Sequence, residues 1–478
     1  MTEKKYFSYD FWSVIILIFY AIMQISRWQL FPQHLDIYYH LLTAWGFIQA
    51  GGYSSWDFWQ YAPVGRPHIY PPLFHIVLAL FMKAGVDKII LAKIFSIVIP
   101  LTFLVTLWSF LRKKFSSCLA FFSLVTISSS LSLYASLTNH MPSTIALTFG
   151  ILAIWQLMNR KTVFALLLLT LCFYTHIGVS YFIMLTLVIY ALFNKEYSRQ
   201  VFIIVMGAVT LAIPMIVRQL SGINLLSLAS VKENYSCEFK TIDYILAIIG
   251  FVILLRSKGK GRLFLALFLA SFVYLPYMAR FFSAEGYLPV ALLAAVALYG
   301  ISESFGRNRY AKYIVVLGTI FMLIFSPTIA TGQLEVGGPL NRIFLFDSAV
   351  MNMLFPKANE RMISSTIWFE KRYSFVSKLI GENSSPDDII YCTEDIVGLC
   401  LAAASGRATA NYLLPEVYSK GRTDPYADSK IIIMLKYHDP KSVKEIVDRY
   451  GLVLLGKNEI LDVYKNPSAL AKMRIRNK

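Results

Sequence analysis

The sequence has 478 residues, of which 57% are hydrophobic and only 15% are charged, and its formal net charge is +17. Apolar stretches recur throughout the first part of the chain, which excludes a single soluble domain and predicts a polytopic α-helical membrane protein. Many basic residues stand in the short breaks between these stretches. Membrane topology therefore explains the positive charge, and we expect no nucleic-acid partner.

The first apolar stretch, residues 11–30, follows Lys4 and Lys5 and has no small-residue cleavage site. We therefore interpret it as a retained span and not as a signal peptide. With the later stretches the chain is predicted to have about eleven transmembrane helices, some shorter than the roughly 20 residues that a crossing needs. The later spans are predicted at residues 89–111, 116–137, 142–158, 163–174, 179–193, 201–217, 244–255, 263–277, 288–302 and 313–325.

Basic clusters set the predicted orientation of these spans. The positive-inside rule places five clusters in the cytoplasm, at residues 112–114, 160–161, 195–199, 256–262 and 307–312. The N-terminus is then cytoplasmic and the C-terminal region extracytoplasmic, in a multi-pass protein of the cell membrane that contacts membrane lipids.

Two domains are predicted from the change in composition near residue 326. Residues 1–328 form the transmembrane domain, with a long first external loop at 31–88, and residues 329–478 form a small α/β domain. Within the loop, residues 73–82 are interpreted as an interfacial or re-entrant helix. The α/β domain is predicted to contain helices at 364–379 and 440–450 and strands at 389–392, 430–435 and 452–455.

The five cysteines lack CxxC spacing. Only Cys392 and Cys400 are close enough in sequence and context to pair, and two free buried thiols are the favoured interpretation.

The first external loop opens with a carboxylate next to the membrane. Asp36 is flanked by His34, Tyr38, Tyr39 and His40. A carboxylate in this setting can bind a divalent cation or act as a general base, and a solvated loop acid is the alternative.

The same loop continues with aromatic and basic residues. Trp56, Asp57 and Trp59 precede Arg66 and His68. The tryptophans can stack on a sugar or anchor at the membrane interface, and the arginine beside a proline-rich backbone can bind a phosphate.

Later external loops add further candidates. Asn139 and His140 are expected to face the same aqueous cavity as Asp36, unless they form only a helix cap and an interfacial histidine. Glu233 can serve as a second carboxylate or remain a solvated loop residue. Arg280, with a glutamate five positions later, can bind an anionic head group or extend toward water, and His176 is interpreted as structural.

These motifs, taken in order, resemble the catalytic subunit of oligosaccharyltransferases in the GT-C superfamily of polyprenyl-phosphate-dependent glycosyltransferases. Asp36 with residues 38–40 resembles that family's first-loop metal-binding acid. Residues 56–66 and then 70–71 are similar to its run of aromatics and acids leading to Tyr-Pro-x-Gly-Arg and a later Tyr-Pro.

The resemblance extends along most of the membrane part and stops in the tail. Residues 138–140 stand where the family has an acidic metal motif, residues 231–233 look like its Val-x-Glu, and Arg280 resembles the arginine that contacts the donor phosphate. The family's Trp-Trp-Asp-Tyr-Gly motif is missing, and residues 393–398 stand in its place.

The resemblance implies a GT-C-type membrane glycosyltransferase. It would transfer a sugar or oligosaccharide from a polyprenyl (dolichyl) phosphate or diphosphate to an extracytoplasmic glycan, lipid or protein acceptor, with a divalent cation (Mg²⁺ or Mn²⁺). Asp36 and Glu233 would be catalytic. The metal would be held by Asp36, Asn139, His140 and Glu233, and the substrates by Tyr38, His40, Trp56, Asp57, Trp59, Arg66, His68 and Arg280.

Three alternatives remain open. The chain can be a true oligosaccharyltransferase for protein N-glycosylation, which the missing tail motif disfavours. It can be a lipid-linked sugar flippase or another transporter, although transporters place ionisable groups near mid-membrane and the acids here cluster at one surface. It can also be a non-catalytic subunit, because Thr138 and His140 replace the family's acids.

Overall fold

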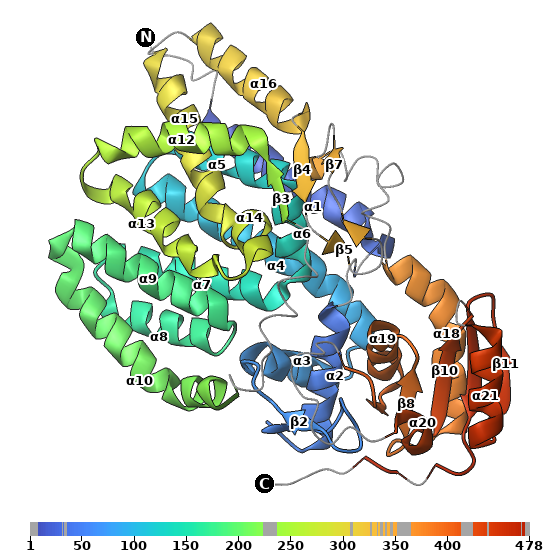
Figure 1. Ribbon diagram of the computed structural model, residues 1–478. Helices are drawn as coiled ribbons and strands as arrows, with labels where there is room; N and C mark the ends of the chain where they lie inside the picture. The colour runs from blue at the N-terminus through green and yellow to red at the C-terminus, as the bar shows by residue number, and fades with distance from the viewer. Residues whose placement is uncertain are drawn as a thin grey trace. The chain divides into compact units, whose positions relative to one another are not determined.

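The computed structural model is mostly helical (Figure 1). It describes residues 8–30, 32, 36–222, 237–305, 309–325, 327–331, 333–334, 338–339, 342–344, 348–350, 365–412, 424–436, 439–469 and 471–473. The chain forms two compact units. The helical unit comprises Met1–Trp28, Phe95–Ile216 and Ala229–Ile363, and the sheet unit comprises Gln29–Ile94, Val217–Leu228 and Ser364–Lys478.

The helical unit contains a helix wherever a span is predicted. The helices are α1 (Tyr9–Ser26), most of α4 (Lys88–Lys114), α5 (Ser117–Ser129), α6 (Leu131–Asn139), α7 (Met141–Met158), α8 (Thr162–Phe173), α9 (Ile177–Phe193), most of α10 (Ser198–Gly222), α12 (Thr241–Leu255), α13 (Arg262–Ser271), α14 (Met278–Ser283), α15 (Tyr287–Ser304) and α16 (Arg309–Phe325). It also holds a three-stranded antiparallel sheet of β3 (Cys237–Lys240), β4 (Thr328–Thr331) and β7 (Arg342–Phe344).

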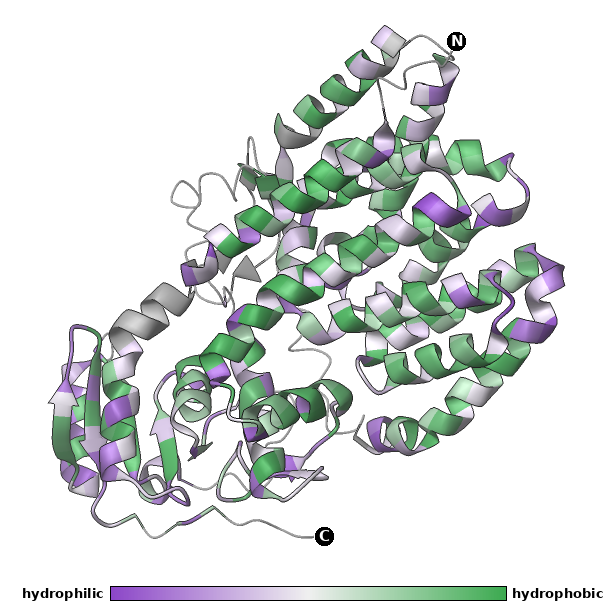
Figure 2. Ribbon diagram, turned by 180° about the vertical axis from the view of Figure 1, so that it is seen from behind, coloured by the Kyte–Doolittle hydropathy of each residue, from purple (hydrophilic) through white to green (hydrophobic). Residues whose placement is uncertain are grey.

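Hydrophobic residues predominate along the helices of this unit (Figure 2). Within the described residues, five helices are long and apolar enough to cross a membrane, and a sixth span results if α5 and α6 are counted together. Large apolar side chains stay on the outside, with Leu192 70%, Phe202 67% and Ile248 66% exposed. Apolar faces of this kind suit contact with lipid, and the polytopic membrane class is confirmed.

The span predicted at 116–137 is wrong in one respect, because the chain bends there. Helices α5 and α6 meet at 85° with only Ser130 between them. The backbone of Ser130 is extended, and its hydroxyl accepts a hydrogen bond from the N–H of Leu133, which makes it the N-cap of α6. Serine side chains compete with the helix for backbone hydrogen bonds, and this accounts for the break.

The sheet unit is built on a five-stranded sheet of order β11-β12-β10-β8-β9. Strands β8, β9 and β10 run parallel, and β12 pairs antiparallel with β10 and β11. The elements are α18 (Ser365–Asn383), β8 (Ile389–Cys392), α19 (Asp395–Ser405), β9 (Ala408–Thr409), α20 (Pro425–Asp428), β10 (Ile431–Leu435), α21 (Pro440–Tyr450), β11 (Val453–Lys457) and β12 (Leu461–Lys465). The predicted strands and helices of the C-terminal region are confirmed, and α19, β9 and β12 are additions.

Helices cover both faces of this sheet. On one face, Val443, Ile446 and Val447 of α21 pack against Ile432 and Met434 of β10. On the other face, Gly456 lies so close to α18 that an added Cβ would stand 2.9 Å from both Leu379 and Phe375. The result is a three-layer α/β/α arrangement, as the alternating pattern predicts.

The first loop, predicted at residues 31–88, belongs to the sheet unit and contains more regular structure than its sequence predicts. It holds α2 (Asp36–Gln49), β1 (Trp56–Asp57), β2 (Arg66–Pro67) and α3 (Leu73–Lys83). The backbone at Trp59 and Ala62 pairs with β9, where Thr409 N–H donates to Trp59 O and Ala62 N–H donates to Thr409 O, each at 3.0 Å. The loop thus extends the C-terminal sheet, while the predicted division at residue 328 stays a prediction.

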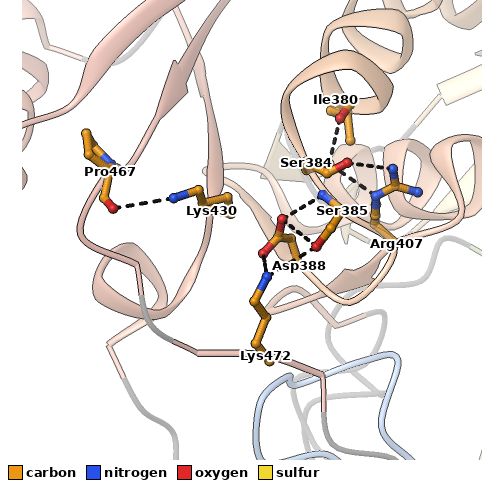
Figure 3. Close-up of polar contacts among 8 residues, drawn as sticks. All are labelled: Ile380, Ser384, Ser385, Asp388, Arg407, Lys430, Pro467 and Lys472. Carbon is orange, nitrogen blue, oxygen red and sulfur yellow. Dashed lines mark hydrogen bonds and ion pairs between the residues drawn. The ribbon is translucent and has the colours of Figure 1, made fainter.

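A polar cluster fastens the C-terminal segment to the sheet unit (Figure 3). Asp388 accepts hydrogen bonds from the backbone N–H and the hydroxyl of Ser385, at 2.7 and 2.9 Å, and pairs with Lys472. Burial alone would raise the pKa of Asp388, but the bonds from Lys472 and Ser385 lower it below its usual value. The Asp388 carboxylate is therefore ionised at neutral pH and holds the segment after β12.

All five cysteines are free thiols, as expected. Cys392 and Cys400 are buried, and burial raises the pKa of Cys392 to about 12. Both are therefore unreactive thiols.

Candidate functional site

A buried acid and an arginine at its edge form the centre of the site in the helical unit. Arg280 on α14 donates from Nη1 to Oε1 of Glu285 at 2.8 Å. The Glu285 side chain is completely buried, whereas that of Arg280 is 36% exposed. The turn between them is tight, because a Cβ on Gly286 would stand 2.7 Å from Cα of Phe281. Glu285 therefore fixes Arg280 from the buried side, while the arginine side chain stays partly exposed.

His176 contacts the same arginine. Its Nδ1 accepts a hydrogen bond from the N–H of Val179 at 3.3 Å and caps the start of α9, so His176 has a structural contact as well as its contact with Arg280. A neutral ring with an accepting Nδ1 keeps its proton on Nε2. That nitrogen lies 3.4 Å from Nη1 of Arg280, so two donors lie close together at this point. Such a pair suits an anionic oxygen.

Asn139 and His140 lie at the end of α6, next to this pair. Asn139 is the last residue of α6 and accepts from the hydroxyl of Thr138 at 3.4 Å, so it is not the N-cap considered from the sequence. His140 is close enough to Glu285 for their charges to interact, and α6 packs against α14. The structure thus brings together His140 and Arg280, which the sequence singled out, with Glu285 and His176.

The metal site stays a prediction. Among the described residues there is no group of three or more His, Cys, Asp or Glu side chains placed to hold a metal ion. Glu233, one of the four predicted ligands, lies outside the described residues. The ligand set of Asp36, Asn139, His140 and Glu233 is therefore untested.

Asp36 opens α2 in the sheet unit and is half-buried. An acid in the first turn of a helix interacts favourably with the helix dipole. Tyr38 and His40 follow on the same helix, and both are buried. His40 is one turn after Asp36, so the two share a face of α2.

Asp57 is the hub of a buried charge cluster in the first loop. Its Oδ2 accepts from Nε of Arg66 at 3.1 Å, and its Oδ1 lies 2.6 Å from Nδ1 of His68. The three residues are at most 4% exposed. Burial opposes the charge of Arg66, but Asp57 together with Tyr39 and Tyr61 outweighs burial, and the pKa of Arg66 is raised. The guanidinium is thus neutralised internally, and its role as a phosphate ligand stays a prediction.

Three imidazoles gather beside this cluster. Nδ1 of His40 lies 2.9 Å from Nε2 of His75, and the ring centres of His68 and His75 are 5.6 Å apart. Burial, and then His40 and His68, lower the pKa of His75 well below its ordinary value, so it is neutral at pH 7. Sequence analysis missed His75, because its partner His40 is on a different helix and no local motif joins them.

The aromatic residues predicted to bind sugar are packing residues in this structure. Trp59 is 0% exposed and lies on α2, so close that a Cβ on Gly46 would stand 2.1 Å from its ring. Trp56 donates from Nε1 to the carbonyl of Val64 at 3.0 Å. Tyr38 is also fully buried. Their predicted contact with sugar is not tested by this arrangement and stays a prediction.

Comparison with solved structures decides the fold. ArnT from Cupriavidus metallidurans bound to undecaprenyl phosphate is 12% identical over 96% of this chain and 99% of that chain, with a TM-score of 0.58. The archaeal oligosaccharyltransferase AglB from Archaeoglobus fulgidus, in complex with an inhibitory peptide and a dolichol-phosphate, is 11% identical over 91% of this chain and 70% of that chain, with a TM-score of 0.57. The chain shares the fold of these two structures.

The GT-C resemblance found in the motifs is confirmed at the level of fold, over nearly the whole chain. A second structure of the Archaeoglobus fulgidus oligosaccharyltransferase, in complex with Zn and sulfate, is 10% identical over 94% of this chain and 73% of that chain, with a TM-score of 0.53. Residues 11–117 match the model of a family of unknown function, DUF6541. No curated protein matches the sequence.

Proposed function

We propose that this protein is a membrane glycosyltransferase that moves a sugar or oligosaccharide from a polyprenyl phosphate or diphosphate to an acceptor outside the cytoplasm. The observation that carries the proposal is the partly exposed Arg280, fixed by the buried Glu285 and flanked by His140 and His176, within a GT-C fold. Two of the similar structures hold a polyprenyl-type phosphate, undecaprenyl phosphate in one and dolichol-phosphate in the other.

In the proposed reaction, an acceptor atom attacks the anomeric carbon of the sugar, and the bond from that carbon to the phosphate oxygen breaks. Asp36 takes the acceptor's proton, and Glu233 supports it as the second carboxylate. The departing phosphate carries the negative charge away, and Arg280 stabilises it. A divalent cation, held by Asp36, Glu233, His140 and Asn139, would neutralise the same charge when bound.

The tail supports an acceptor other than a peptide sequon. The residues that replace the missing Trp-Trp-Asp-Tyr-Gly motif connect β8 to the first turn of α19. Thr393 bonds to β10: its N–H donates to Ile433 O at 3.0 Å, and its hydroxyl accepts from Leu435 N–H at 3.1 Å. Asp395 accepts from the side chain of Asn411 at 2.8 Å. These bonds occupy the polar groups of the segment, so N-glycosylation is the second choice and a glycan or lipid acceptor the first.

The test uses the purified protein in lipid nanodiscs with a radiolabelled polyprenyl-phosphate-linked sugar. We expect release of polyprenyl phosphate, and Arg280→Gln should lower kcat/KM by about 10²-fold, as expected when a transition-state charge loses one donor. Asp36→Asn should lower kcat/KM by about 10²- to 10⁴-fold, the range expected for the loss of a general base.

Arg160→Gln is the matched control, because Arg160 pairs with Glu196 at 2.7 Å on the surface, where both side chains are exposed. Wild-type activity in Arg280→Gln would refute the phosphate role. Movement of the donor across liposomes without cleavage of the sugar–phosphate bond would refute the enzyme and favour the flippase.

A further inference from the structure

Arg27 is a buried arginine in the helical unit that the site described above does not use. It follows α1 as its C-cap residue and is 4% exposed. Its Nη1 donates to the hydroxyl of Tyr134 on α6 at 3.0 Å. Within the described part of the chain, its other two nitrogens, Nε and Nη2, are buried and have no hydrogen-bond partner.

A chain of buried hydrogen bonds fixes this guanidinium. Having accepted from Arg27, the Tyr134 hydroxyl donates to Oε1 of Gln24 at 3.0 Å. The amide of Gln24 in turn donates to the hydroxyl of Tyr20 at 3.1 Å. The orientation of Arg27 is therefore set by α1 and α6 before any ligand binds.

The charge of Arg27 is not balanced inside the described protein. Arg280 has Glu285 and Arg112 has Asp10, whereas no carboxylate among the described residues forms an ion pair with Arg27. A buried charge without a partner is strongly disfavoured, and in a membrane domain it marks a site for a charged ligand. The compensating ligand must be an anion.

The free edge of the guanidinium indicates which anion. Nε and Nη2 form one edge of the planar guanidinium, and an N–H of each points outward from that edge in the same direction. This pair binds two oxygens of one phosphate or carboxylate group in parallel. Because α6 contacts Arg27 through Tyr134 and also packs against α14, which carries Arg280, both arginines neighbour the same helix.

We propose that Arg27 binds a phosphate ester through Nε and Nη2 and holds the phosphate group of a polyprenyl phosphate next to the site of Arg280. The choice of a lipid phosphate rests on the proposed function, whereas the bidentate phosphate contact does not. Arg27 is thus a second phosphate ligand supplied by the first membrane helix, and Tyr134 is its positioning residue.

The test measures binding without turnover, in the full-length protein in nanodiscs of zwitterionic lipid. The probes are a short-chain polyprenyl monophosphate, the corresponding uncharged polyprenol and inorganic phosphate. Arg27→Gln should raise the Kd for the monophosphate at least tenfold and leave polyprenol binding unchanged. Arg27→Lys keeps the charge but loses the paired N–H groups, so its Kd should fall between those of the wild type and Arg27→Gln.

Arg112→Gln is the control, because Arg112 is half-exposed and paired with Asp10 at 2.8 Å. NMR of the wild-type protein gives a second readout that does not depend on the folding of a variant. The Nε–H resonance of Arg27 should shift when the monophosphate is added and should not shift when polyprenol is added. An unshifted resonance, or equal Kd values for Arg27→Gln and wild type, would overturn the proposal. Binding of inorganic phosphate as tight as that of the monophosphate would overturn the lipid assignment.

The proposed function can fail separately. Monophosphate binding that depends on Arg27, without any sugar transfer, would refute the transferase and keep this site. Sugar transfer by the wild type, together with unchanged monophosphate binding in Arg27→Gln, would keep the transferase and refute the Arg27 site.

Discussion

The pair formed by Arg280 and Glu285 yields the most quantitative prediction, because the chain contains a matched pair on its surface. Nη1 of Arg280 lies 2.8 Å from Glu285, and Nη2 of Arg160 lies 2.7 Å from Glu196. The distances are nearly equal, but the Glu285 side chain is 0% exposed and that of Glu196 is 62% exposed. Burial is therefore the main difference between the two ion pairs.

Removing one member of a buried pair costs about 3 to 5 kcal/mol, because the other charge stays buried without a partner. Since Arg280 is itself 36% exposed, water can partly replace it, and we expect a loss near the low end, about 3 kcal/mol, for Arg280→Met. The coupling energy from a double-mutant cycle with Glu285→Gln should be about 2 kcal/mol, against roughly 0.5 kcal/mol for the pair of Arg160 and Glu196.

The assay is unfolding by denaturant in detergent micelles, with seven proteins forming the two cycles: the shared wild type, four single variants and two double variants. The slope with denaturant must stay constant for the free energies to be compared. Coupling energies that agree within about 0.5 kcal/mol would refute the reasoning, since additivity errors have that size. Such a result would mean that Glu285 does not hold Arg280 in place.

Three further predictions concern the sheet unit. Gly46→Ala should cost about 1 to 3 kcal/mol and loosen the first loop, measured by hydrogen exchange, because its Cβ would overlap Trp59, whereas Gly52→Ala meets nothing within 4 Å and should be neutral. The pKa of His75 is lowered in the folded protein, so below about pH 6.5 the unfolded chain binds a proton at His75 and the folded protein does not. Denaturant unfolding measured at several pH values should therefore show up to about 1.4 kcal/mol of stability lost per pH unit as the pH falls. The variant His75→Asn should lack this slope. Asp388→Asn should lower the free energy of unfolding by about 1 to 3 kcal/mol and speed proteolysis of the segment after β12. Because the pKa of Asp388 is lowered in the folded protein, its contribution to stability is present above about pH 4 and is lost as the pH falls through the folded pKa.

The sequence predicts the features that depend on composition and on regular spacing along the chain. The membrane class follows from the apolar stretches, and the strand at 389–392 and the helix at 440–450 follow from patterns of apolar residues. Basic clusters predict one side of the membrane for Asn139, His140 and Arg280, and in the structure α6, which ends at Asn139, packs against α14, which carries Arg280. Each of these inferences uses residues near one another in the chain.

Features that depend on distant contacts could not be predicted in the same way. The break at Ser130 follows three consecutive serines, yet serine runs also occur inside straight helices. The loop around Trp59 pairs with β9, a strand some 350 residues later, and neither segment has a pattern that names the other. The partnership of His40 and His75 is hidden for the same reason. In physical terms, local propensity decides helices and strands, whereas packing decides which side chains meet.

The three most informative arginines differ in how far the protein itself satisfies them. Arg66 has its whole charge matched by Asp57 and is 4% exposed, so an added anion would displace an existing bond. Arg280 is paired with Glu285, and its side chain is 36% exposed. Arg27 has a neutral partner, Tyr134, and a buried edge without one. Since a ligand gains most where the protein has left a charge uncompensated, the effect of Arg→Gln on polyprenyl phosphate binding should fall in the order Arg27, Arg280, Arg66. The opposite order would show that exposure, and not the missing counter-charge, governs binding of the phosphate.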